Sequence, residues 1–95
     1  MNAFRAREGV ELVEICGEYL LVATKDAREA CPFATQINKA AADYWKLLDG
    51  PCTIQTLADK AVEKLGTDAK SSFLSALMFV SKMSKTGYIV MEDRG

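Results

Sequence analysis

The stretch CPFATQINKAAADYW, residues 31–45, decides how this sequence folds, because it joins an expected strand to an expected helix. The short run from Phe33 to Ile37 looks like a strand; it begins directly after Pro32 and is followed by Asn38. Proline lacks a backbone donor and is confined to edge strands or strand starts, so we predict that this run is an edge strand. Proteins usually cover or blunt such edges, which raises the question of what covers this one.

The residues before this stretch predict a β-hairpin. In VELVEICGEYLLVAT, apolar and polar residues alternate from Val10, as expected for a half-buried strand. Cys16-Gly17 marks the turn, since glycine supplies the positive φ that tight hairpins need. A second strand follows over residues 18–23. With the edge strand, the hairpin makes a three-stranded antiparallel sheet, about the minimum that is stable when it packs on helices.

The residues after this stretch predict three helices, each with a capping residue and a stop. The start and stop signals are Asn38 and Gly50-Pro51, then Thr53 and Gly66, then Thr67 or Asp68 and Gly87. Helical spacing assigns these residues to buried faces: Ala41, Tyr44, Trp45 and Leu48 in the first helix, Ile54, Leu57, Ala61 and Leu65 in the second, and Phe73, Leu77 and Val80, with Ser84 in line with them, in the third. Residues 88–91 form a short apolar tail or strand. The predicted class is α+β, a winged helix-turn-helix-like fold.

Length and charge limit the classes of function. A chain of 95 residues predicts a single domain over 1–95. A net charge of −1 gives no electrostatic basis for binding a phosphate backbone, so we expect no nucleic-acid partner. The N-terminus lacks the apolar core of a signal peptide, and no stretch is apolar enough to span a bilayer. We therefore expect a cytoplasmic protein without a membrane partner.

The sequence lacks the residues that most catalytic sites need. The chain has no histidine, which excludes a histidine base and the common nucleophilic triads. Its three cysteines, Cys16, Cys31 and Cys52, form no CxxC pair and are interpreted as reduced thiols. The glycines are scattered, so no loop is expected to bind phosphate. We predict no enzyme activity, no catalytic residue, no metal and no cofactor.

The order of three strands and three helices leaves a winged-helix DNA-binding protein as an alternative. The candidate recognition helix, DAKSSFLSALMFVSKMSK, carries Lys70, Lys82 and Lys85. It has no arginine, asparagine or glutamine to read base edges. Its middle is apolar and rich in serine, which suits a peptide better than a duplex.

Four segments in this order resemble the PqqD family, whose members are RiPP precursor peptide recognition elements: GVELVEICGEYLLVAT, FATQINKAAADYWKLLDG, TIQTLADKAVEKLG and FVSKMSKTGYI. The resemblance covers residues 7–90. Its most specific pieces are Ile37-Asn38, where members commonly have Leu-Asn, and residues 42–45 with 47–50. Where many members place an aspartate early in the last helix, this chain has Ser75, which argues against recognition of a basic leader through that acid.

The resemblance implies a peptide-binding module that captures the leader of a ribosomally made precursor and presents it to a modifying enzyme, often a radical SAM enzyme. In the family, the leader adds as a strand to the edge of the third strand, beside the third helix, a binding mode known as β-augmentation. The peptide-binding residues that this implies are Phe33, Ala34, Thr35, Gln36 and Ile37 at the edge, and Lys70, Phe73, Leu74, Leu77 and Met78 on the third helix. A structural domain that dimerises through its edge strand is a further alternative, so the chain is expected to be a monomer or a homodimer.

Overall fold

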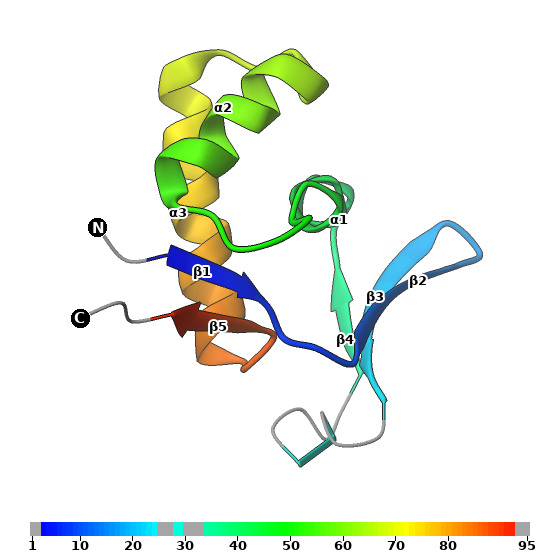
Figure 1. Cartoon of the computed structure of the whole chain (residues 1–95). Helices are drawn as coiled ribbons and strands as arrows, with labels where there is room; N and C mark the ends of the chain where they lie inside the picture. Colours follow the sequence, from blue (N-terminus) through cyan, green and yellow to red (C-terminus); the bar gives the residue numbers. More distant parts are fainter. Residues whose placement is uncertain (1–2, 25–27, 30–33, 93–95) are drawn as a thin grey trace.

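The computed structural model describes residues 3–24, 28–29 and 34–92 (Figure 1). The elements follow in the order β1 (Ala3–Ala6), β2 (Val10–Ile15), β3 (Glu18–Ala23), β4 (Thr35–Ile37), α1 (Lys39–Lys46), α2 (Ile54–Leu65), α3 (Ala69–Lys85) and β5 (Ile89–Glu92). The predicted α+β class is confirmed, with a three-stranded antiparallel sheet followed by three helices. Within the described part of the chain, no helix has the length and apolar character that crossing a bilayer requires.

The predicted hairpin is present and turns where expected. β2 and β3 pair antiparallel, with Ile15 opposite Glu18, so Cys16 and Gly17 form a two-residue loop. Both loop residues have positive φ, 52° and 78°, as a type I′ turn requires, and this turn matches the twist of the flanking strands. The ribbon of β2 and β3 extends away from the helices (Figure 1).

β4 lies at the edge of the sheet, as predicted, but it is shorter than predicted. The strand order is β2-β3-β4, and three residue pairs join β4 to β3, from Leu21 opposite Thr35 to Tyr19 opposite Ile37. Ala34 lies before the strand and is exposed. Phe33, which we expected to start the strand, lies outside the described residues. The described strand is as long as its pairing with β3, which joins three residues of each strand.

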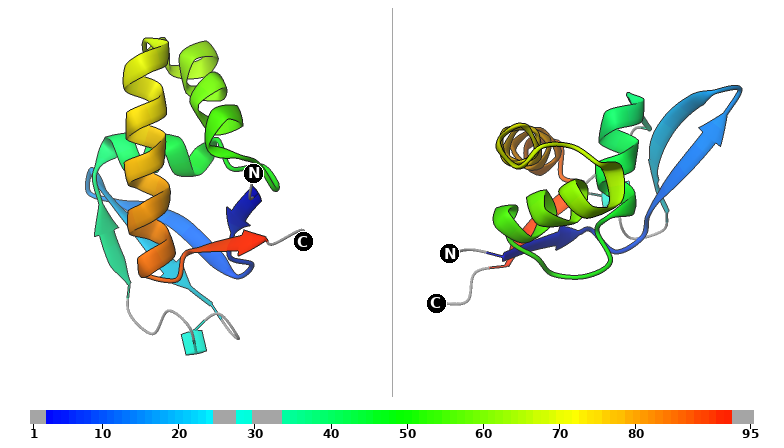
Figure 2. Two further views of the ribbon diagram at one scale, coloured as in Figure 1. Left: turned by 90° about the vertical axis from the view of Figure 1, so that its left-hand side faces the viewer. Right: turned by 90° about the horizontal axis from the view of Figure 1, so that it is seen from above.

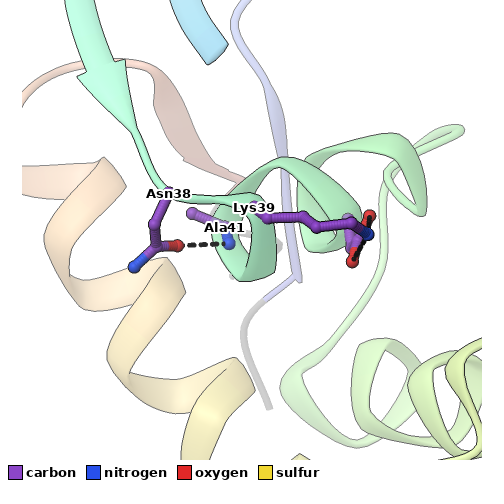
Figure 3. A network of polar contacts seen from close by, with 4 residues as sticks. Asn38, Lys39 and Ala41 are labelled. Atoms are coloured by element: carbon purple, nitrogen blue, oxygen red, sulfur yellow. Dashed lines mark hydrogen bonds and ion pairs between the residues drawn. The ribbon is translucent and has the colours of Figure 1, made fainter. Parts of the chain in front are cut away.

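Asn38 turns the chain from β4 into α1 (Figure 3). Its side-chain oxygen accepts a hydrogen bond from the amide of Ala41 at 2.8 Å, which confirms the predicted N-cap. α1 ends earlier than predicted, at Lys46 instead of Gly50-Pro51. The amide of the C-cap residue, Leu47, bonds to the carbonyl of Tyr44 at 3.0 Å, so the last turn tightens and the helix stops there.

The other helix ends agree with the sequence signals. Thr53 caps α2 and Asp68 caps α3, each accepting from an amide three residues later. Gly66 ends α2 with a φ of 70°, the left-handed conformation that favours glycine. The Asp68 carboxylate accepts hydrogen bonds from the hydroxyl and the amide of Ser71, and these bonds lower the pKa of the carboxyl, so this cap remains ionised at neutral pH.

A second sheet, formed by β1 and β5, was not predicted. The two strands pair antiparallel, from Ala3 opposite Glu92 to Ala6 opposite Ile89, and the apolar tail is therefore a strand. On its other side β1 meets Cys52, since the Phe4 amide donates to the Cys52 carbonyl at 2.8 Å. Arg5 Nε lies 2.7 Å from Glu92 Oε1 and links the two strands. Phe4 is fully buried, so this sheet closes one side of the core.

The core confirms the predicted burial of Trp45 but corrects the orientation of α3. Trp45 is only 8% exposed. The predicted core residues Phe73 and Leu77 of α3 are 40% and 45% exposed, whereas Val80 is buried as expected. The buried face of α3 consists of Ser72, Ala76, Phe79, Val80 and Met83. Small side chains at Ser72 and Ala76, which sequence periodicity did not single out, let α3 pack closely on the body of the protein.

Candidate peptide-binding site

The edge of β4 that faces away from β3 exposes the backbone of Gln36. In antiparallel sheets, successive residues turn their N–H and C=O groups to opposite sides of the strand. The two-residue turn makes Ile15 and Glu18 a hydrogen-bonded pair of β2 and β3. The Thr24 amide donates to the Gly9 carbonyl at 2.7 Å, which agrees with hydrogen-bonded pairs at every second position along the two strands. Because Glu18 bonds to β2, Tyr19 and Leu21 direct their backbone groups toward β4. Their partners Ile37 and Thr35 therefore bond to β3, and Gln36 directs both of its backbone groups outward.

The side chains of β4 fix the strand on the core and leave its edge accessible. Ile37 is buried, at 6% exposure, whereas Gln36 is exposed. The hydroxyl of Thr35 forms a hydrogen bond with the hydroxyl of Tyr88, just after α3, at 2.7 Å. This contact links β4 to the C-terminal end of α3. The ribbon of β4 lies beside this end of α3 in Figure 2 (left). β4 is therefore short, but it is anchored through the one face of the sheet that carries Thr35 and Ile37.

A cavity of about 380 Å³ lies between the start of α1 and the middle of α3. Its lining residues are Asn38, Ala40, Ala41, Tyr44, Ser75, Met78, Phe79, Lys82 and Met83. The rings of Tyr44 and Phe79 stack with centroids 5.7 Å apart and form an apolar wall. The small side chains of Ala40 and Ala41 leave room at the α1 side. We call this cavity the α1–α3 groove.

Asn38 connects the edge of β4 to the α1–α3 groove. It follows Ile37, the last residue of β4, and it lines the groove. Figure 3 shows its side chain at the point where the strand becomes the helix. An extended peptide along β4 would thus pass from the open strand edge to the mouth of an apolar groove. The two features form one candidate site.

The groove contains one cationic side chain, Lys82, and no carboxylate among its lining residues. Nearby on α1, Lys39 pairs with Asp43 at 3.2 Å, and this hydrogen bond raises the pKa of the lysine. Neither of these two residues lines the groove. Ser75, which stands where the resembling family often has an aspartate, does line it. The polarity of the groove therefore suits an apolar or acidic guest better than a basic one.

The described residues show no cluster of side chains that could hold a metal ion. No group of three or more histidine, cysteine, aspartate or glutamate side chains comes together in residues 3–24, 28–29 and 34–92. Cys52 is buried, and burial raises the pKa of its thiol, which disfavours the reactive thiolate.

The structure brings together only some of the residues expected to bind peptide. Thr35, Gln36 and Ile37 form β4, and Met78 lines the groove. The remaining expected residues of α3 are exposed but lie outside the groove: Lys70, Phe73, Leu74 and Leu77. The reason is helical periodicity, since Ser75, Met78 and Lys82 share one face of α3 at spacings of three and four residues.

Sequence reasoning missed most of the groove. The missed lining residues are Asn38, Ala40, Ala41, Tyr44, Phe79 and Met83. Asn38 was recognised as a helix cap and Tyr44 as a core residue, but neither was assigned to a binding surface. Lys82 lines the groove because it lies four residues after Met78 and therefore on the same face of the helix.

The fold of this chain is similar to that of a solved structure. No protein-family model matches the sequence, and no curated protein matches it. The chain is similar to the solution NMR structure of the PqqD truncation of Methylobacterium extorquens PqqCD, which represents a functional and stand-alone RiPP recognition element. The TM-score is 0.68 and the identity 18%, and the alignment covers 96% of this chain and 89% of that chain. This chain therefore has the PqqD fold, and the resemblance predicted from its sequence is confirmed at the level of the fold.

Proposed function

We propose that this chain is a member of the PqqD family and acts as a non-catalytic recognition element for a ribosomally made precursor peptide. It captures the leader by strand addition to β4 and presents the peptide to a modifying enzyme such as a radical SAM enzyme. The observation that carries this proposal is the outward-facing backbone of Gln36 next to the α1–α3 groove. The PqqD fold supports it. Because the precursor is made on ribosomes, we place the encounter in the cytoplasm.

Two kinds of contact would share the recognition. Backbone pairing with Gln36 gives affinity that depends little on the guest sequence. Alternate side chains of the guest point to one face, so one of them can enter the groove against Tyr44 and Phe79. Lys82 at the groove would favour a guest carboxylate and orient the peptide.

Apolar side chains of the leader are expected to dominate its affinity. Replacing the residue that enters the groove by alanine should cost about 1–3 kcal/mol of binding free energy, the value of one buried side chain. Raising the salt from low to physiological concentration should weaken binding only slightly, because exposed charges add mainly orientation and rate. Calorimetric titration of a leader alanine series at two salt concentrations measures both effects.

The result that would contradict this expectation is a steep salt dependence together with small effects of the apolar truncations. Such a result would favour a charged partner, including nucleic acid. Sedimentation of the chain alone tests the remaining alternative. If the chain dimerises and the leader cannot compete with the dimer, the edge of β4 serves self-association instead of peptide capture.

A further inference from the structure

Four large apolar side chains project from α3 without a place in the core. They are Phe73, Leu74, Leu77 and Met78, exposed by 40%, 53%, 45% and 73%. Phe73 with Leu77 and Leu74 with Met78 are four residues apart, so the four side chains are neighbours on the helix surface. Single exposed hydrophobic residues are ordinary, but a contiguous patch marks an interaction site. We call these four residues the α3 outer face.

The α3 outer face is largely separate from the α1–α3 groove. An α-helix turns by about 100° per residue, so Phe73 and Leu77 lie more than a third of a turn away from Ser75 and Lys82. Only Met78 belongs to both surfaces. A peptide in the groove would therefore leave Phe73, Leu74 and Leu77 uncovered, and it would lie directly beside them.

The charges around the α3 outer face define the kind of partner that fits. α3 contains Lys70, Lys82 and Lys85, all exposed, and it has no acidic residue. A complementary surface is apolar at its centre and carries carboxylates at its rim. Resting on the proposed function, we propose that the modifying enzyme docks on the α3 outer face through such a surface. Through Met78, this places the enzyme next to the bound leader.

Charge also argues against the other occupants. A second copy placed on this face by a two-fold axis would bring lysines of one α3 close to lysines of the other. An anionic membrane surface is usually bound by clusters of about four to eight basic residues, and α3 has three lysines. Nucleic acid is disfavoured by the net charge of −1 and by the apolar centre of the face.

A charge substitution on this face separates enzyme docking from leader binding. Leu74→Glu places a charged carboxylate against the expected apolar centre and near the expected acidic rim, and glutamate is a good helix former, so α3 should remain folded. The matched control is Ile15→Glu at the tip of the hairpin, because Ile15 is 56% exposed and far from α3 in sequence and fold. Under the proposed function, the probes are the purified radical SAM or other peptide-modifying enzyme and the precursor leader with which this chain would act, each titrated by calorimetry.

We expect Leu74→Glu to weaken enzyme binding by about tenfold or more, as loss of one interface anchor does, and to leave leader affinity within about twofold. Ile15→Glu should change neither. The inference is overturned if the enzyme does not bind the wild type, or if Leu74→Glu leaves its affinity unchanged. It is also overturned if Leu74→Glu weakens leader binding instead, or if it abolishes self-association or binding to phosphatidylserine vesicles. Failure of the wild type to bind the leader would contradict the proposed function itself.

Discussion

Replacing Gln36 by proline is expected to weaken leader binding by at least about tenfold while the domain stays folded. Proline removes the outward N–H and places its ring where a guest strand must lie. One lost hydrogen bond is worth about 1 kcal/mol, and the steric conflict adds to it. Thr35 and Ile37 retain their amides toward β3, and edge strands tolerate proline. Leader titration and circular dichroism measure the two properties.

Glu14→Pro is the matched control for this prediction. Glu14 lies on β2, at the opposite edge of the same sheet, and by the same alternation its amide faces away from β3. This variant should fold and bind the leader as the wild type does. Equal losses of affinity in both variants would mean that proline acts through the stability of the sheet. Unchanged affinity in a folded Gln36→Pro protein would exclude strand addition at β4.

Replacing Trp45 by alanine is expected to lower the free energy of unfolding by about 3–5 kcal/mol. The side chain is 8% exposed and belongs to the core cluster, so its removal forfeits transfer free energy and leaves a cavity. Denaturant unfolding followed by circular dichroism measures the change. If the alanine variant does not fold, Trp45→Phe should fold with an intermediate midpoint.

Leu74→Ala provides the comparison for the core variant. Leu74 is also a large helical apolar residue, but it is 53% exposed, so its truncation should change stability by no more than about 0.5 kcal/mol. A loss at Leu74 as large as that at Trp45 would mean that the α3 outer face is packed within the chain. A midpoint of Trp45→Ala close to the wild type would mean that the indole does not belong to the core.

Local signals predicted most of the fold because short-range chemistry determines those elements. The hairpin turn at Cys16-Gly17 requires positive φ at both residues. The helix caps Asn38, Thr53 and Asp68 each accept a hydrogen bond from an amide three residues later. The β1–β5 sheet has no such signal. Its strands lie at the two ends of the sequence, and nothing in the run AFRA indicates that it pairs with residues 89–92.

The candidate site was less predictable than the fold, because register and helix rotation depend on packing. Sequence identified the β4 edge, but the choice of Gln36 as the outward-facing residue requires the strand register. The apolar stripe of α3 is wider than one face, so periodicity alone could not decide between Phe73 and Phe79. Packing buries Phe79 together with Ala76 and leaves Phe73 exposed.

Amide hydrogen exchange at Gln36, with and without the leader peptide, tests the central claim most directly. In the free chain the Gln36 amide faces the open edge of β4 and should exchange quickly, whereas the amides of Thr35 and Ile37 bond to β3. Strand addition predicts that a saturating leader protects Gln36 strongly. Thr35 and Ile37 should change much less. A leader that binds while Gln36 exchanges at its free rate would contradict peptide capture at this edge.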